Sequence, residues 1–202
     1  MTKTAKLSLT ALALATLAAC GGSSTPIVTG PQPTPNPLTF REIADIAADV
    51  NVGYNRESIT PKALVPVGGS ATYSGAVGGD ITVGSNVTDI AGLMEMDVDF
   101  RANRVGGILG NFVTRQGDQI DGTLSVRNGV LNRQSNSQQV AIFGDVGGNL
   151  RSAAGEDMSV DARIRNSGFK GRNVEFVGGD IEGDIFVDGR RGDLDLDLQL
   201  ER

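Results

Sequence analysis

The sequence predicts an all-β fold: an eight-stranded antiparallel up-and-down β-barrel, preceded by one short N-terminal helix. Apolar and charged residues alternate in several segments, which is the pattern of a strand with one buried face. Short turns rich in Gly, Asn and Asp separate the segments, as antiparallel neighbours require. The chain also holds 28 glycines, which let strands coil around a narrow barrel.

The first 20 residues have the three parts of a bacterial lipoprotein signal peptide. Lys3 and Lys6 form a charged start, and residues 7–17 form an apolar run. This run is shorter than the roughly 20 residues that cross a bilayer. It ends in the lipobox LAAC, whose last residue, Cys20, is the only cysteine of the chain. We expect residues 1–19 to be removed and Cys20 to be the lipid attachment site, acylated with palmitate-type chains. The alternative is a plain signal peptide with a cysteine near its end.

Composition excludes several functions. Without the leader, 16 basic and 24 acidic residues remain, a net charge of −8 that disfavours nucleic acid as a partner. The chain has no histidine, which removes the usual catalytic triads and the commonest transition-metal ligand. We therefore expect no enzyme activity, no catalytic residues, no metal site and no cofactor.

Residues 20–38 form the second segment, the lipidated cysteine and a Pro/Gly-rich tether. Five of the seven prolines lie here, mostly at every second position, which favours polyproline II. Such a tether holds a domain up to about 50 Å from its lipid. A proline-rich ligand for a recognition module is the alternative.

Residues 39–70 form the third segment, a short helix and an extended lead-in. Thr39 and Glu42 have the spacing of a capping box. The apolar residues that share one helical face are Phe40, Ile43, Ile46, Ala47 and Val50. We predict a helix to about Val50 that packs on the barrel or plugs one end.

Residues 71–202 form the predicted barrel. The alternating strands are expected at 94–101, 120–127, 158–165, 181–188 and 193–200, and three more at 71–83, 105–115 and 138–150. Turns are expected at Arg127-Asn128-Gly129 and Asp188-Gly189. A membrane-spanning barrel would need an apolar band toward lipid, and inverting this barrel would crowd carboxylates such as Asp195 into the lumen. We therefore expect a water-soluble barrel with Leu196 and its equivalents inside.

Short glycine-based motifs suggest a family. They are YSG at 73–75, MDVDF at 96–100 and NRVGGIL at 103–109, followed by FKG at 169–171 and the stretch 179–186. With these motifs the chain resembles, over roughly residues 71–201, the β-barrel domain of transferrin-binding protein B and its relatives. The large relatives pair each barrel with a handle domain and repeat the pair, whereas this chain has one barrel.

The resemblance implies a lipid-anchored binding protein on the outer membrane of a Gram-negative bacterium. Ligands of such proteins include transferrin, lactoferrin, complement factor H and haem carriers. We expect a monomer, at the cell surface or on the periplasmic face, that captures a host protein or a nutrient such as an iron source. A structural envelope lipoprotein and a lipocalin-like small-molecule carrier are the alternatives. We expect no specific haem or iron binding, because histidine is absent, Tyr54 and Tyr73 are the only tyrosines, and Met94 and Met96 are patterned as core.

Overall fold

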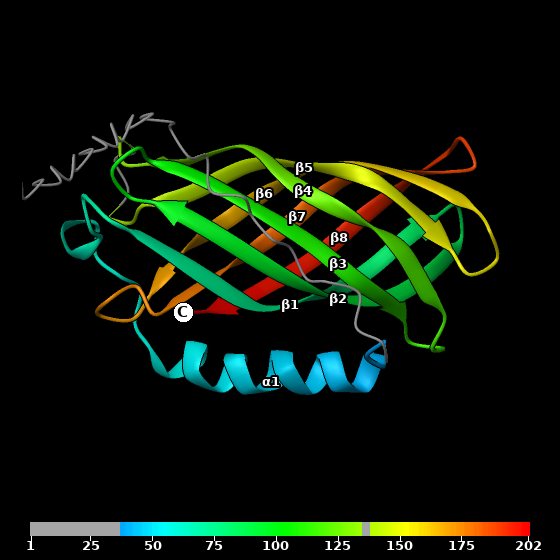
Figure 1. Cartoon of the computed structure of the whole chain (residues 1–202), viewed down its shortest axis with the longest axis horizontal. Coiled ribbons are helices and arrows are strands. Elements are labelled where there is room, and N and C mark those ends of the chain that lie inside the picture. The colour runs from blue at the N-terminus through cyan, green and yellow to red at the C-terminus, as the bar shows by residue number, and fades with distance from the viewer. Residues whose placement is uncertain (1–36, 135–137) are drawn as a thin grey trace, which may run out of the picture.

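The structure, a computed structural model, describes residues 37–134 and 138–202, which form a closed barrel with one helix on its outer wall (Figure 1). The predicted leader, Cys20 and the tether up to residue 36 lie outside the described residues. The elements are α1 (Phe40–Arg56), η1 (Lys62–Leu64), β1 (Ser70–Val83), β2 (Asn86–Asp99), β3 (Arg104–Thr114), β4 (Gln119–Asn132), β5 (Ala141–Ser152), β6 (Asp157–Lys170), β7 (Phe176–Val187) and β8 (Arg190–Glu201). Each strand pairs antiparallel with the next, and β1 closes the barrel on β8. The predicted fold class is confirmed.

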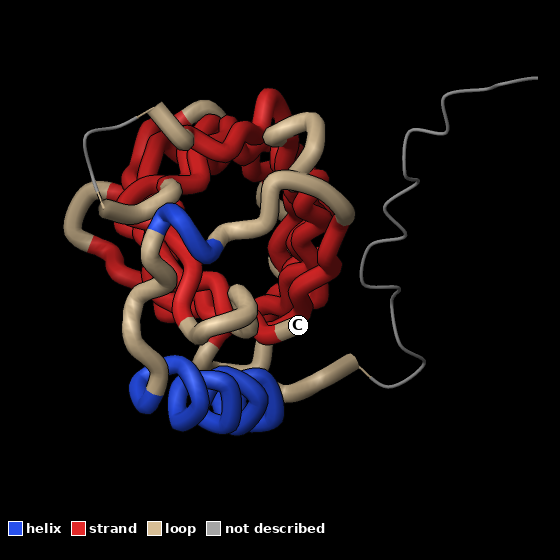
Figure 2. Tube along the Cα trace, turned by 90° about the vertical axis from the view of Figure 1, so that its left-hand side faces the viewer, coloured by secondary structure: helices blue, strands red, loops and turns tan. Residues whose placement is uncertain are grey.

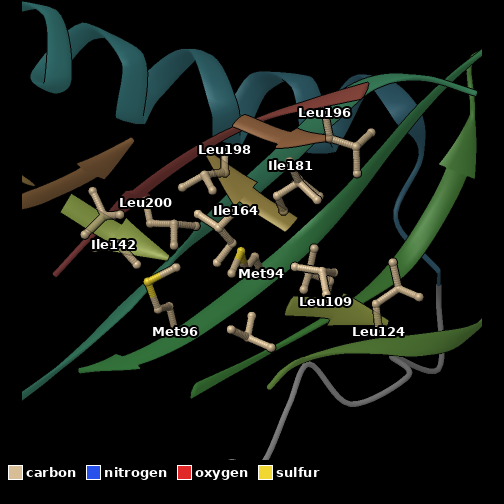
Figure 3. Close-up of a cluster of buried hydrophobic side chains, with 14 of the residues drawn as sticks. Met94, Met96, Leu109, Leu124, Ile142, Ile164, Ile181, Leu196, Leu198 and Leu200 are labelled. Atoms are coloured by element: carbon tan, nitrogen blue, oxygen red, sulfur yellow. The ribbon is translucent and has the colours of Figure 1, made fainter. Parts of the chain in front are cut away.

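The barrel interior is apolar, as the alternation predicted. The leucines of β8 from Leu194 to Leu200 are at most 2% exposed, whereas the aspartates between them are exposed. Met94 and Met96 of β2 are at most 1% exposed. Figure 3 shows these side chains pointing toward one another from different strands. The middle of the barrel is therefore a packed core.

One predicted turn is wrong, because β4 continues through Arg127-Asn128-Gly129. The pairing of β4 with β5 shifts its register between Arg127 and Val130, which marks a β-bulge. Asn128 has φ 53°, and its Nδ2 donates to Asp145 Oδ2 at 2.9 Å. The Asn-Gly pair that is typical of a hairpin turn builds a bulge here instead.

The other predicted turn is confirmed. Asp188 and Gly189 connect β7 and β8, with φ 48° and φ 78°. Two successive positive φ angles are the mark of a two-residue hairpin turn that matches the twist of its strands.

Helix α1 begins as predicted and ends later. Thr39 N donates to Glu42 Oε2 at 2.8 Å, and Glu42 N donates to Thr39 Oγ1 at 3.3 Å, which completes the capping box. The helix runs to Arg56 rather than ending near Val50. The extra length lies on β7, where an added Cβ at Gly53 would be 2.5 Å from the ring of Phe176.

Helix α1 packs on the outside of the barrel and does not plug it. It lies against β1, β2, β7 and β8. Ile43 on its apolar face packs in a small outer cluster with Ala76, Ala91 and Val113 of the barrel wall. Of the two predicted placements, packing on the barrel wall is therefore confirmed.

The lead-in 57–69 closes one end of the barrel. Val65 is 3% exposed and joins the core, and Arg133 donates to its carbonyl at 3.4 Å. Thr60 Oγ1 donates to the carbonyl of Gly171 at 2.6 Å. Figure 2, which looks onto this end, shows the short helix η1 lying across it. Any opening of the barrel must therefore lie at the other end.

Tyr73 anchors the closed end from inside, which leads to a prediction. It is fully buried, and its hydroxyl donates to the carbonyl of Val174 at 2.8 Å. Burial raises the pKa of Tyr73 well above its usual range. Because Tyr73→Phe would leave a buried carbonyl without its donor, we expect it to lower the free energy of unfolding by about 1–2 kcal/mol in urea denaturation.

Tyr54 provides the matched control. It lies on α1, and no described residue forms a hydrogen bond with its hydroxyl. We expect Tyr54→Phe to change the free energy of unfolding by less than about 0.5 kcal/mol. An equal fall in the free energy of unfolding for Tyr73→Phe and Tyr54→Phe would contradict a stabilising role of the hydrogen bond from the Tyr73 hydroxyl.

Candidate ligand-binding mouth

The end of the barrel away from η1 holds a cavity of about 560 Å³. The β1–β2, β3–β4, β5–β6 and β7–β8 connections surround it, and we call this cavity the mouth. Its volume falls within the roughly 300–1,000 Å³ of typical small-molecule pockets. A closed end, a packed middle and a hollow end therefore follow one another along the barrel.

The floor of the mouth is apolar. Ile81 from β1, Ile120 from β4 and Met158 from β6 line it, and each is 5–6% exposed. Val83 and Val187 continue this surface toward the opening. Ile81, Ile120 and Met158 also belong to the core cluster of the barrel, so the floor continues into the core. An apolar group that enters the mouth would leave water against them.

The rim of the mouth is polar and charged. It carries Asp118, Glu156, Asp188 and Arg190. No described residue forms an ion pair with any of these four. An apolar floor with polar groups placed at the opening is the usual design of a site for a small amphiphilic molecule.

Two of the rim turns share one construction. Asp118 N donates to Thr114 Oγ1 at 3.1 Å, and Glu156 N donates to Ser152 Oγ at 3.1 Å. In each turn the residue before the acid is a glycine with positive φ: φ 98° at Gly117, and φ 89° in the second turn. The Thr or Ser therefore holds the turn, and the acidic residue that follows the glycine lies at the mouth.

The third acidic turn is built differently. Asp188 is the first residue of the β7–β8 turn, and its Oδ1 accepts from the backbone N–H of Asp157 at 3.0 Å. This bond ties the β7–β8 turn to the start of β6. Each of three connections at this end therefore contributes one carboxylate to the rim.

The four residues that the sequence offers as possible haem or iron ligands lie away from the mouth. Tyr73 is under the closed end, and Met94 and Met96 are in the core. Tyr54 is on the outer wall, where the Lys170 ammonium lies 3.8 Å from its ring centroid. The lining residues were missed, although the motif [ST]-x-x-G-[DE] occurs at both 114–118 and 152–156 and would have marked two of the rim turns.

The outer wall of β7, β8 and β1 is acidic. Asp80 lies directly opposite Asp195, and Asp180 opposite Asp197. Partial burial, together with the neighbouring carboxylates of Asp180 and Asp195, raises the pKa of Asp197. Within residues 37–134 and 138–202, no three His, Cys, Asp or Glu side chains are arranged to hold a metal ion. This wall adds to the negative field of the protein.

Comparisons with known proteins concern the fold. No family model matches the chain, and no curated protein matches it. Among solved structures, the chain is similar to a double mutant of the vaccine antigen Transferrin Binding Protein B from Haemophilus parasuis, with a TM-score of 0.45 and 15% sequence identity. The match covers 71% of this chain, and this chain spans 28% of the length of that one. No helix in the described ranges is long and apolar enough to cross a membrane.

Proposed function

We propose that the protein is a monomeric outer-membrane lipoprotein of the transferrin-binding protein B type. It binds a small ligand in its mouth and does not transform it. The mouth is the observation that carries the proposal, because it combines a cavity of about 560 Å³ with an apolar floor and a polar rim. A cavity of this size suits a small molecule, so nutrient capture is favoured over capture of a host protein.

The two alternatives make different demands on the barrel. A lipocalin-like carrier needs a ligand space in the barrel centre, and there the side chains of Met94, Leu109 and Leu124 are packed in the core. A structural envelope lipoprotein needs no ligand space at all. The mouth therefore supports a binding protein whose ligand sits at one end of the barrel.

Binding at the mouth is tested by filling it. Ala154 lies in the β5–β6 turn, lines the mouth and is exposed. We expect Ala154→Trp to weaken the binding of Nile red, a neutral apolar dye, by about tenfold or more, because the indole would occupy the ligand space. The measurement is a fluorescence titration of the purified protein.

The matched control is Ala102→Trp. Ala102 is also an exposed turn alanine, but it lies in the β2–β3 turn at the closed end. We expect this variant to bind Nile red like the unchanged protein. Equal binding by both variants, or no binding by the unchanged protein, would contradict the proposal, and the second result would favour the structural alternative.

The anchor is proposed to be the acylated Cys20. Gly21 follows it, where inner-membrane retention often uses Asp, and this favours the outer membrane. The described chain reaches the barrel beside the mouth, because Gln119 Nε2 donates to the carbonyl of Leu38 at 3.4 Å. The tether that leads to Cys20 therefore joins the barrel at the end that holds the mouth.

Replacing the cysteine tests the anchor. We expect Cys20→Ser to abolish acylation and to release the protein from the membrane fraction, since no thiol remains to carry a lipid. The measurement is cell fractionation with immunoblotting. Continued sedimentation of Cys20→Ser with membranes after detergent-free washing would contradict the lipoprotein proposal.

A further inference from the structure

We infer that the ligand of the mouth is a cationic amphiphile, a molecule with a positively charged head group and a short apolar tail. The inference rests on the proposed function and adds the chemical class of the ligand.

The positive charge of the ligand follows from the rim. Asp118, Glu156 and Asp188 come from three different turns around one opening, and among the described residues Arg190 is the single cation that lines it. None of the three carboxylates is neutralised by an ion pair with a described residue. The opening therefore carries an excess of two negative charges over an apolar floor of low polarisability, which concentrates the field at the rim.

The apolar tail follows from the floor. Ile81, Ile120 and Met158 offer no hydrogen-bond donor to a polar ligand group at the bottom of the mouth. Thr114, which is 8% exposed, is the buried polar residue of the described lining, and its Oγ1 already accepts from the backbone N–H of Asp118. A tail placed against the floor gains affinity with each methylene that leaves water.

A bare metal ion does not fit the same features. The described carboxylates are nowhere grouped three together as metal ligands, and an ion would make no use of the apolar floor. The head group of an anionic amphiphile would be attracted by one guanidinium and repelled by three carboxylates, so the rim disfavours it. An organic cation satisfies the rim and the floor together.

Three octyl amphiphiles with different head groups test the inference. Octyltrimethylammonium, octyl glucoside and octyl sulfate share one tail, and each is titrated below its micelle concentration against the purified protein loaded with Nile red. We expect octyltrimethylammonium to displace the dye at about tenfold lower concentration than octyl glucoside, and octyl sulfate to be the weakest. Equal or stronger displacement by octyl sulfate or octyl glucoside would overturn the inference.

A pair of double variants separates the rim from the overall charge. Asp118→Asn with Glu156→Gln removes two rim carboxylates, whereas Asp121→Asn with Asp161→Asn removes two exposed carboxylates of β4 and β6 that do not line the mouth. We expect the rim variant to weaken octyltrimethylammonium about fivefold or more and to leave octyl glucoside unchanged. We expect Asp121→Asn with Asp161→Asn to change the affinities for octyltrimethylammonium and for octyl glucoside little. Equal weakening of the cation in the two variants would overturn the inference.

The outcomes distinguish this inference from the proposed function. If Nile red binds and Ala154→Trp abolishes its binding, but the head groups show no preference, the proposed function stands and the ligand class is wrong. If Nile red fails to bind the unchanged protein, the proposed function itself fails.

Discussion

Leu196→Asp is expected to unfold the protein. Leu196 is 1% exposed and lies in the packed core of the barrel, where Figure 3 shows it beside Ile181. An unpaired carboxylate in such a place costs several kcal/mol, against a total stability of about 5–15 kcal/mol for a typical domain. We expect circular dichroism to show no cooperative thermal transition for this variant.

The neighbouring residue gives the control. Asp195 is exposed on the outer wall, where Asp80 and Glu182 lie opposite it on the two adjacent strands. We expect Asp195→Leu to keep the fold, because it buries no charge and relieves repulsion between carboxylates that face one another. A folded Leu196→Asp beside an unfolded Asp195→Leu would reverse the assignment of the inner and outer faces.

Gly79→Val is expected to have the second large effect. Gly79 lies opposite Leu196 in the pairing of β1 with β8. An added Cβ would lie against the carbonyl oxygen of Asp195 and 2.9 Å from the Cα of Leu196, so the backbone of β8 would have to move. We expect the free energy of unfolding to fall by about 3 kcal/mol or more, measured by urea denaturation.

Gly68→Val is the control for the chemistry of the substitution. Gly68 precedes β1, and no atom lies within 4 Å of a Cβ built there. We expect this variant to change the free energy of unfolding by less than about 1 kcal/mol. A similar fall in the free energy of unfolding for Gly79→Val and Gly68→Val would mean that the close approach of β1 and β8 does not limit the side chain at Gly79.

The sequence predicted the strands well because their periodicity has a single physical cause. Alternate side chains of β8 enter the core, so Leu196 and Asp195 could be assigned to opposite faces from the pattern alone. The Asn-Gly pair at 128–129 was wrongly assigned to a turn, because a positive φ at Asn128 occurs both in a hairpin turn and in a bulge, and the neighbouring strands decide between them. The sequence did not predict that α1 continues past Val50 to Arg56. This part of the helix packs on β7, because Gly53 has no side chain and leaves room for the ring of Phe176.

The mouth and the closed end could not be read from periodicity. The lead-in 57–69 has no regular pattern, and its role depends on single contacts such as that of Thr60 with Gly171. The mouth is lined by residues from the ends of all eight strands and from the turns between them, which only closure of the barrel brings together. Met158 follows the core pattern of β6, and its position at the end of that strand places it at the mouth.

Methionine methyl NMR tests most directly whether the mouth is the ligand-binding end. Met158 lines the mouth, whereas Met94 and Met96 lie in the packed core, so one residue type reports from both places. Octyl glucoside, titrated below its micelle concentration, provides a probe without charge. We expect the Met158 methyl resonance to shift in a saturable manner and those of Met94 and Met96 to stay in place. Shifts at Met94 and Met96 with none at Met158 would contradict binding at the mouth.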